Sequence, residues 1–211
     1  MNFKELVFKY TNYELTDDQI DQFEIYYNFL VEYNKKVNLT RITEKTDVYL
    51  KHFLDSILPI KQLDFTKINT VIDMGSGAGF PRIPLKILYP HLEIVLVDAR
   101  KKKLVFLDAL IEKLKLSNIK TMHERLEKIA LKNHFDLATA RALSSMEDII
   151  KYACPLIKSG GYILSYKSLK YKEELNEISS TSKNKIKLIN ISDYYLPNDS
   201  GTRYNILIKK I

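Results

Sequence analysis

The amino-acid sequence predicts an α/β fold: a doubly wound, mostly parallel sheet with helices on both faces. From about residue 70 onward, short apolar runs typical of buried strands alternate with stretches of helical periodicity. A glycine-rich loop, residues 75–79, follows the first of these runs. The last two apolar runs, 185–191 and 204–208, flank a turn-like segment and are expected to pair antiparallel.

Residues 1–60 read as a helical extension in front of the sheet-bearing domain, residues 61–211. Thr16 and Gln19 have the spacing of a capping box, so a helix is expected to begin there and to end near Asn34. Its apolar face at helical spacing comprises Ile20, Phe23, Tyr27, Leu30 and Val31. Residues 38–40 favour a turn, and a second helix is expected from Val48 to Leu58, directly before Pro59.

The sheet-bearing domain alternates regularly between strands and helices. Strands are expected at residues 70–73, 93–97, 118–122, 135–138 and 162–166. Helices are expected at residues 101–116, 124–130, 146–156 and 171–178, with Pro155, Gly160 and Gly161 ending the third of them. Pro81 and Pro84 suit the first turn of a further helix after the glycine loop. In such a sheet a ligand binds at the carboxyl ends of the strands, near the topological switch point.

The charge distribution favours a polyanionic partner. The chain carries 33 basic and 26 acidic residues, a formal net charge of +7. Residues 1–70 hold 9 basic and 11 acidic residues, a balance of −2, whereas residues 71–211 hold 24 and 15, a balance of +9. A basic field attracts nucleic acid. However, 27 of the 33 basic residues are lysines, a bias that genome composition or solubility alone also produces.

Composition also limits the class of protein. No apolar run is long enough to cross a bilayer and the first residues lack the apolar stretch of a signal peptide, so a soluble cytosolic protein is expected. The single cysteine, Cys154, excludes an internal disulfide and a cysteine-built zinc site. No metal is expected, because no group of side chains has metal-ligand spacing. Nothing in the sequence requires more than a monomer.

The loop after the first strand predicts a nucleoside-binding site. Asp73 is followed by Gly75, Gly77 and Gly79, and glycine lets the backbone turn sharply and approach a ligand closely. A dinucleotide fingerprint has the spacing G-x-G-x-x-G, whereas Phe80 stands here in the place of its last glycine. The observed spacing is typical of S-adenosylmethionine loops in Rossmann-like methyltransferases. The alternative is an ordinary strand-to-helix turn.

Asp98 ends the second predicted strand, where a carboxylate can accept hydrogen bonds from both hydroxyls of a ribose. The same position also suits the N-cap of the helix that begins near Lys101. The cofactor interpretation therefore depends on the glycine loop and the acid together.

The loop after the fourth predicted strand narrows the chemistry of the transfer. Methylation of exocyclic amines usually uses an Asn/Asp-Pro-Pro-aromatic loop, and residues 139–142 are Thr-Ala-Arg-Ala. Methylation of cytosine C5 needs a cysteine nucleophile on that loop, whereas Cys154 lies in a predicted helix and reads as core. A ring nitrogen with a free lone pair, such as guanine N7, needs neither nucleophile nor metal. The enzyme would then contribute alignment and proximity.

Basic residues near the strand ends are candidate contacts. Arg141 could hold a carboxylate or the O6/N7 edge of guanine, or form a structural ion pair instead. The run from Arg100 through Lys101 to Lys103 could face phosphates or form a solvated helix N-terminus. Lys167, just past the fifth strand, is another candidate for a phosphate or substrate contact.

Seven segments match one known family in order and over essentially the whole chain. They are Asn34–Thr40, Lys51–Ser56, Asp73–Pro81, Val97–Lys103, Arg125–Glu127, Ala140–Ala142 and Arg203–Lys210. Together they resemble the bacterial small-subunit rRNA (guanine-N7) methyltransferases, formerly called glucose-inhibited division protein B. The Asn-Leu-Thr and His-x-x-Asp-Ser motifs before the glycine loop are the specific part of the match.

The resemblance implies methyl transfer from S-adenosylmethionine to N7 of one guanosine in 16S rRNA, near the decoding region of the small ribosomal subunit. It implies that Gly75 and Phe80 line the cofactor pocket and that Leu126 and Glu127 contact the adenine end. Arg141 would sit against the cofactor or the target base. Substrate candidates in the matching segments are Asn38, Thr40, His52, Asp55, Ser56 and Arg203.

One position departs from the family pattern. Arg82 stands where the family usually has glycine after Phe-Pro. An arginine there adds bulk and charge beside the cofactor loop. It could contact a phosphate or the methionine carboxylate, or weaken cofactor binding.

Two other functions remain open at this stage. One is a small-molecule methyltransferase, since the same fold serves many substrates. The other is an RNA chaperone or assembly factor with a vestigial cofactor site. The basic balance after residue 70 argues against the first, and the intact glycine loop with Asp98 argues against the second. The sequence does not distinguish free rRNA from an assembled subunit as substrate.

Overall fold

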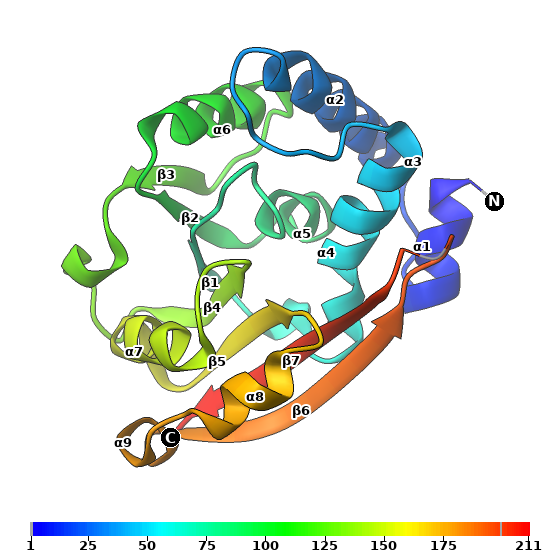
Figure 1. Ribbon diagram of the computed structural model, residues 1–211. Coiled ribbons are helices and arrows are strands. Elements are labelled where there is room, and N and C mark those ends of the chain that lie inside the picture. The colour runs from blue at the N-terminus through cyan, green and yellow to red at the C-terminus, as the bar shows by residue number, and fades with distance from the viewer. Residues whose placement is uncertain (1, 199) are drawn as a thin grey trace.

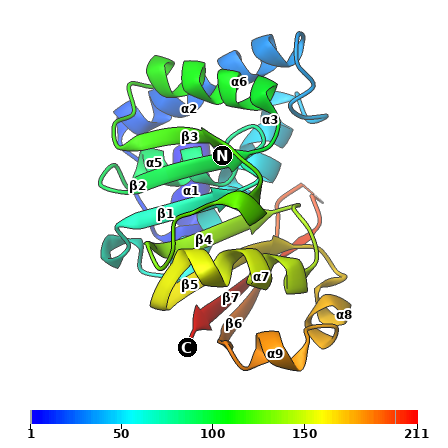
Figure 2. The same cartoon turned by 90° about the vertical axis from the view of Figure 1, so that its left-hand side faces the viewer.

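A computed structural model describes residues 2–198 and 200–211 and shows a seven-stranded sheet with helices on both faces (Figures 1 and 2). The strand order is β3-β2-β1-β4-β5-β7-β6. Strands β1 to β5 pair in parallel, and β7 is antiparallel to both β5 and β6. The strands are β1 (Thr70–Met74), β2 (Glu93–Asp98), β3 (Ile119–His123), β4 (Phe135–Arg141), β5 (Ile157–Lys167), β6 (Ile186–Tyr195) and β7 (Thr202–Lys210).

The predicted fold class is confirmed. The chain order reverses at β1, which lies between β2 and β4, so the switch point is at the carboxyl end of β1. The glycine loop begins at that end. The sheet topology therefore favours ligand binding at the carboxyl end of β1, beside the glycine loop, as predicted from the sequence.

Successive strand residues point to opposite faces, and each face has its own hydrophobic cluster. Val71 of β1 belongs to one cluster and Ile72 to the other. The first face is covered by α1 (Phe3–Thr11), α2 (Asp17–Asn34), α5 (Arg82–Leu88) and α6 (Lys101–Lys113). The second face is covered by α7 (Met146–Leu156), α8 (Tyr171–Asn176) and α9 (Ser180–Lys183). The N-terminal extension therefore packs on the first face only (Figure 2).

Helix α2 confirms the predicted capping box and its end at Asn34. Of its predicted apolar face, Phe23 and Leu30 are fully buried, while Ile20, Tyr27 and Val31 are partly buried. Gln19 and Tyr26 are buried as well, which apolar spacing alone does not show, because their polar tips bond backbone carbonyls of the sheet-bearing part.

The second helix of the extension is not one regular helix from Val48 to Leu58. It consists of α3 (Lys45–Val48), a π-helical segment η1 (Tyr49–Leu54), α4 (Asp55–Ile57) and the 3₁₀ helix η2 (Leu58–Lys61). Pro59 lies inside η2 rather than after the helix. A π segment widens the turn, and such segments often occur at functional sites.

Two further predictions need correction. Gly160 and Gly161 lie inside β5 instead of ending α7. Position 161 needs a glycine for packing within the sheet, because a Cβ there would meet the Lys158 and Asp136 carbonyl oxygens at 2.9 and 3.0 Å. Residues 124–130 form only the 3₁₀ turn η4 (Leu126–Lys128). Another 3₁₀ turn, η3 (Phe65–Lys67), precedes β1. Among the described residues, no helix is long and apolar enough to span a membrane.

Candidate functional site

Two neighbouring cavities lie at the carboxyl ends of the parallel strands. The first has a volume of about 470 Å³ and the second about 580 Å³. Residues 142–144, directly after β4, belong to the walls of both. Two ligands bound side by side would therefore meet at this loop.

The first cavity brings together residues that the sequence singled out: Gly75, Asp98, Arg100, Lys103, Leu126 and Glu127. They come from the ends of β1 and β2, from the start of α6 and from η4. Other predicted cofactor or phosphate residues are absent from the described wall of this cavity: Gly77, Gly79, Phe80, Lys101 and Arg141.

The glycine loop has a backbone that only glycine adopts easily. Gly75 and Gly79 have φ angles of +77° and +94°. A Cβ at Gly75 would lie 2.8 Å from Leu143 Cδ1, and a Cβ at Gly79 would lie 2.8 Å from both Ile83 Cγ1 and Tyr26 Oη. The absence of a side chain at Gly75 therefore leaves space beside Leu143 in the wall of the first cavity. At Gly79 it allows Ile83 and Tyr26 to pack directly against the loop.

Asp98 fixes the loop from the cavity side. Its Oδ2 accepts a hydrogen bond from the Gly77 N–H at 3.0 Å, and its Oδ1 accepts one from the Arg100 N–H at 2.9 Å. The N-cap of α6 is Arg100, so the alternative prediction that Asp98 is the N-cap is wrong. Each carboxylate oxygen has a second lone pair, so Asp98 retains acceptor capacity at the cavity wall.

Tyr26 fixes the loop from the opposite side, which the sequence did not reveal. Its hydroxyl donates to the Ala78 carbonyl at 2.5 Å, and its ring stacks on Phe80 with 5.2 Å between centroids. Burial raises the pKa of the Tyr26 hydroxyl well above its ordinary value, so it remains a donor. No motif marks this residue, because its partner is a backbone carbonyl more than 50 positions away.

Phe80 is buried inside the site rather than exposed to the first cavity, with 5% of its surface accessible. His52 stacks on it at 4.4 Å between ring centroids, and the Arg141 guanidinium carbon lies 5.0 Å from its ring centre. Phe80 therefore connects the glycine loop with the polar wall of the second cavity.

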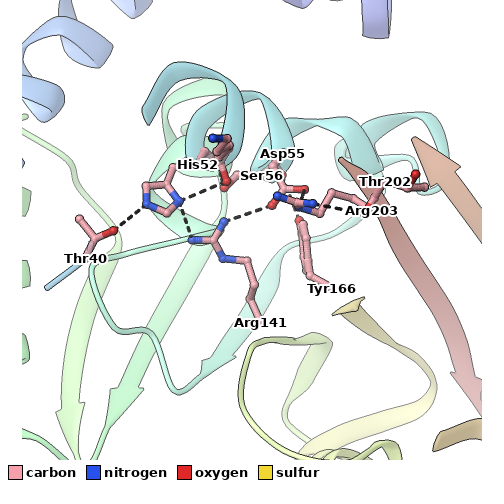
Figure 3. A network of polar contacts seen from close by, with 9 residues as sticks. Thr40, His52, Asp55, Ser56, Arg141, Tyr166, Thr202 and Arg203 are labelled. Carbon is pink, nitrogen blue, oxygen red and sulfur yellow. Dashed lines mark hydrogen bonds and ion pairs between the residues drawn. The ribbon is translucent and has the colours of Figure 1, made fainter. Parts of the chain in front are cut away.

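That wall is a chain of polar contacts from the extension to β7 (Figure 3). Thr40 Oγ1 lies 3.0 Å from His52 Nε2, and Arg141 Nη2 lies 3.3 Å from His52 Nδ1. Arg141 Nη1 donates to Asp55 Oδ2 at 3.2 Å, and Arg203 Nε lies 4.0 Å from Asp55 Oδ1. Arg141 thus forms the ion pair that the sequence left as its alternative role, and four predicted substrate candidates meet here.

His52 is neutral in this environment. Burial and the neighbouring Arg141 cation lower the pKa of His52 to about 3. His52 Nδ1 lies 3.3 Å from Arg141 Nη2 and 3.2 Å from the Lys51 carbonyl oxygen, and Nε2 lies 3.0 Å from Thr40 Oγ1. The ring is thereby held from both sides, by Arg141 and Lys51 at Nδ1 and by Thr40 at Nε2.

Asp55 is the acid of this wall that pairs with Arg141, and it is 4% exposed. Burial raises the pKa of its carboxyl group, and Arg141 and Arg203 oppose that rise. Its Oδ1 has no hydrogen-bond partner within the described part of the chain. The wall therefore contains an acceptor with unused capacity.

Two other predicted contacts have internal roles, and a third lies outside both cavities. Lys167 lines the second cavity, but its ammonium group donates to the Ser144 carbonyl and to Glu174, so it is not the free phosphate contact expected. Ser56 is fully buried and donates to the His52 carbonyl, which excludes direct contact with RNA. Asn38 is exposed and lies outside both described cavity walls.

Arg82 does not lie beside the cofactor cavity, and its predicted contact with a phosphate or carboxylate ligand is wrong. Its side chain is 0% exposed, with Nε 3.9 Å from Asp73 Oδ1 and the guanidinium carbon 5.9 Å from the Phe65 ring centre. None of its three guanidinium nitrogens has a hydrogen-bond partner among residues 2–198 and 200–211. The first turn of α5 directs this side chain toward β1 and η3 instead.

A comparison with protein families decides the family. The model GidB, described as rRNA small subunit methyltransferase G, matches residues 19–194. The chain belongs to this family. Ribosomal RNA small subunit methyltransferase G from Lactobacillus acidophilus is 42% identical over 220 residues, covering 100% of this chain and 92% of the relative. The enzyme of that name from Bacillus subtilis is 40% identical over 206 residues, covering 93% and 84%.

Solved structures agree on the fold of this small subunit methyltransferase G family member. A SAM dependent methyltransferase from Aquifex aeolicus has a TM-score of 0.59 at 17% identity, over 86% of this chain and 98% of that one. A SAM-dependent O-methyltransferase from Thermotoga maritima has a TM-score of 0.56 at 15% identity, over 86% and 71%. At such low identity the likeness is one of fold, and the substrate follows from the family and the site.

Proposed function

We propose that this protein transfers a methyl group from S-adenosylmethionine to N7 of a guanosine in 16S rRNA, acting as a monomer in the cytoplasm. The observation that carries the proposal is the pair of cavities that meet at residues 142–144. One has a glycine loop and an acid suited to a nucleoside, and the other has two arginines suited to a nucleotide. Membership of the rRNA small subunit methyltransferase G family supports rRNA of the small subunit as the substrate.

The residues of the first cavity fit the cofactor. A Cβ at Gly75 would fill space at the wall, and Asp98 has acceptor capacity for the ribose hydroxyls. Leu126 offers an apolar surface to the adenine, and Glu127 an acceptor beside it. When bound, S-adenosylmethionine would supply an electrophilic methyl group on a sulfonium.

The residues of the second cavity fit a reaction that needs no general base. Guanine N7 carries a free lone pair and no proton, so the protein has only to align the base. Arg141 and His52 are held rigidly, and neutral His52 has no charge to add beside a base that becomes cationic. A small apolar acceptor fits poorly, because the lining of this cavity includes the charged side chains of Asp55, Arg141 and Arg203.

The proposal is tested by methyl transfer from labelled S-adenosylmethionine to 16S rRNA, both naked and assembled in 30S subunits, followed by mapping of the modified base. A single 7-methylguanosine is expected. Labelling of a pyrimidine or of an exocyclic amine would retain the cofactor and refute the N7 assignment. Absence of labelling in both RNA forms would refute the proposal.

Removal of the Asp98 carboxylate is expected to weaken S-adenosylmethionine binding. Asp98→Ala should raise the Kd by roughly 5- to 150-fold, equivalent to about 1–3 kcal/mol, since it removes ribose acceptors and the anchor of the Gly77 N–H. Isothermal titration calorimetry measures this. Asp108→Ala is the matched control, because Asp108 is an exposed acid of α6 that bonds Thr121. Equal affinity in both variants would mean that Asp98 only shapes the loop.

Removal of the Tyr26 hydroxyl is expected to weaken cofactor binding from outside the cavity. Tyr26→Phe leaves the Ala78 carbonyl without its donor, so the Kd for S-adenosylmethionine should rise about 3- to 10-fold. Tyr13→Phe removes a bond of 2.9 Å from the extension to the Leu88 carbonyl at the far end of α5, and with it the acceptor of a bond from Gln19 Nε2. Both variants should lose stability in urea, and only Tyr26→Phe should lose affinity. A parallel loss of affinity in Tyr13→Phe would contradict a specific role of Tyr26.

A further inference from the structure

The second cavity contains a buried carboxylate with an unused acceptor. Asp55 lies in its wall, and Asp55 is absent from the described wall of the first cavity. Arg141 occupies Oδ2 at 3.2 Å, whereas Arg203 approaches Oδ1 only to 4.0 Å, beyond hydrogen-bonding distance. An acid that served only to neutralise two arginines would be expected to bond both. The spare oxygen requires another explanation, since an unsatisfied buried acceptor is costly.

We infer that Asp55 reads the Watson–Crick edge of the target guanine, accepting hydrogen bonds from its N1–H and its exocyclic N2 amine. This inference rests on the proposed function and names the group that selects the base. Guanine presents two adjacent donors on that edge; Oδ1 of Asp55 has no partner, and Oδ2, which accepts from Arg141, keeps a second lone pair. Adenine has an acceptor at N1 and would face the carboxylate with repulsion.

The position of Asp55 agrees with the orientation that the target guanine must take, with N7 toward the cofactor and the Watson–Crick edge away from it. N7 and the Watson–Crick edge lie on opposite sides of the purine. If N7 faces the shared loop at residues 142–144, the other edge faces the part of the second cavity that is remote from the first. Asp55, on α4, lines the second cavity and is absent from the described wall of the first, as this orientation requires, and Arg203 of β7 stands beside it (Figure 3).

The Arg203 side chain can move away from Asp55 Oδ1 when the base binds. Its side chain is 32% exposed, its Nη1 donates to the Thr202 carbonyl at 3.2 Å, and its Nε stays 4.0 Å from Asp55 Oδ1. A small outward movement of this side chain uncovers Oδ1 without breaking the bond between Asp55 and Arg141. The carboxylate would also favour the product electrostatically, because methylation at N7 places positive charge on the base that it contacts.

The test compares one RNA substrate carrying either guanosine or inosine at the methylated position. Inosine keeps N7, O6 and N1–H and lacks the N2 amine. For the native protein, kcat/KM should be roughly 10- to 100-fold lower on the inosine RNA, as expected for loss of a hydrogen bond to a charged acceptor. In Asp55→Ala the two RNAs should differ by less than about threefold. The intrinsic difference in N7 reactivity is the same for both proteins and cancels in the comparison.

The ratio of the two rates separates recognition from structural damage. Arg203→Ala is the control: it should lower both rates and keep the preference for guanosine. If Asp55→Ala is too slow to assay, Asp55→Asn retains the shape and one acceptor oxygen, and its ratio should lie between the native value and one. Calorimetry with S-adenosylmethionine verifies that the first cavity of each variant is intact.

Each outcome has one meaning. A native protein that methylates both RNAs equally, or an Asp55→Ala variant that keeps the full preference for guanosine, overturns the inference while the proposed function stands. A native protein that does not methylate the guanosine RNA overturns the proposed function itself.

Discussion

Replacing Asp73 with alanine is expected to lower the free energy of unfolding by about 3–5 kcal/mol. The carboxylate is the nearest acid to the buried Arg82 guanidinium, at 3.9 Å, and both side chains are at most 1% exposed. Removal of one member of a buried ion pair leaves the other charge without compensation in a poorly polarisable interior. Thr139, whose hydroxyl donates to Asp73 Oδ1 at 2.7 Å, would lose its acceptor as well. Urea unfolding followed by circular dichroism measures the loss.

A second substitution separates the effect of the uncompensated Arg82 charge from the other effects of Asp73→Ala. In the double variant Asp73→Ala/Arg82→Met the buried cation is replaced by an apolar side chain of similar length, and most of the lost stability should return. Cofactor affinity should change little on Arg82→Met alone, because Arg82 is buried outside the described wall of the first cavity. An Asp73→Ala protein as stable as the native one would show that the guanidinium finds another partner.

The sequence predicts the sheet well because strand periodicity and glycine position are local signals. The alternation of apolar runs from Thr70 to Lys210 yields the strand positions, and the loop after β1 marks the switch point. The π-helical segment at residues 49–54 is not readable in the same way. Its residues have ordinary helical periodicity, and no local signal marks the widened turn, in which Leu50, His52, Phe53 and Leu54 are all buried.

The site is predicted less completely, since a motif records which residues are needed and not what they contact. Within the Lys51–Ser56 motif, Asp55 lines the second cavity while Ser56 is fully buried and bonds a backbone carbonyl of its own helix. Phe80 and Arg82 both follow the glycine loop closely in sequence, yet both side chains are buried and absent from the described wall of the first cavity. Such differences depend on helix orientation and long-range packing, which no single segment encodes.

Arg141 is the residue whose loss is expected to reduce activity most. Arg141→Met should lower kcat/KM for 16S rRNA by at least about a hundredfold, because the guanidinium holds Asp55 and His52 and lies over Phe80. The Kd for S-adenosylmethionine should change much less, since Arg141 lines the second cavity. Lys187→Met, which removes an exposed charge from the edge strand β6, is the matched control. A variant with nearly native kcat/KM would contradict the assignment of the second cavity to the base.

The same variant should change the titration of His52. Burial and the Arg141 cation together lower the pKa of His52 from 6.5 to about 3, so removal of the cation should raise it while burial keeps it below 6.5. Nuclear magnetic resonance of the histidine Cε1–H groups measures the midpoint, with His52→Asn assigning the signal. An unchanged midpoint would mean that burial alone depresses the pKa.

The shifted pKa also sets the direction of the pH dependence of stability. Between pH 6.5 and about 3 the unfolded chain takes up a proton at His52 that the folded protein does not. The stability that depends on neutral His52 is therefore complete above pH 6.5 and is lost as the pH falls toward 3. In Arg141→Met the two pKa values lie closer together, so the part of the acid-induced loss that comes from His52 should be smaller. Urea unfolding at pH 7 and pH 5 measures this: the free energy of unfolding should differ less between the two pH values in Arg141→Met than in the native protein. The reason is that the Arg141 cation, which disfavours protonation of His52, has been removed.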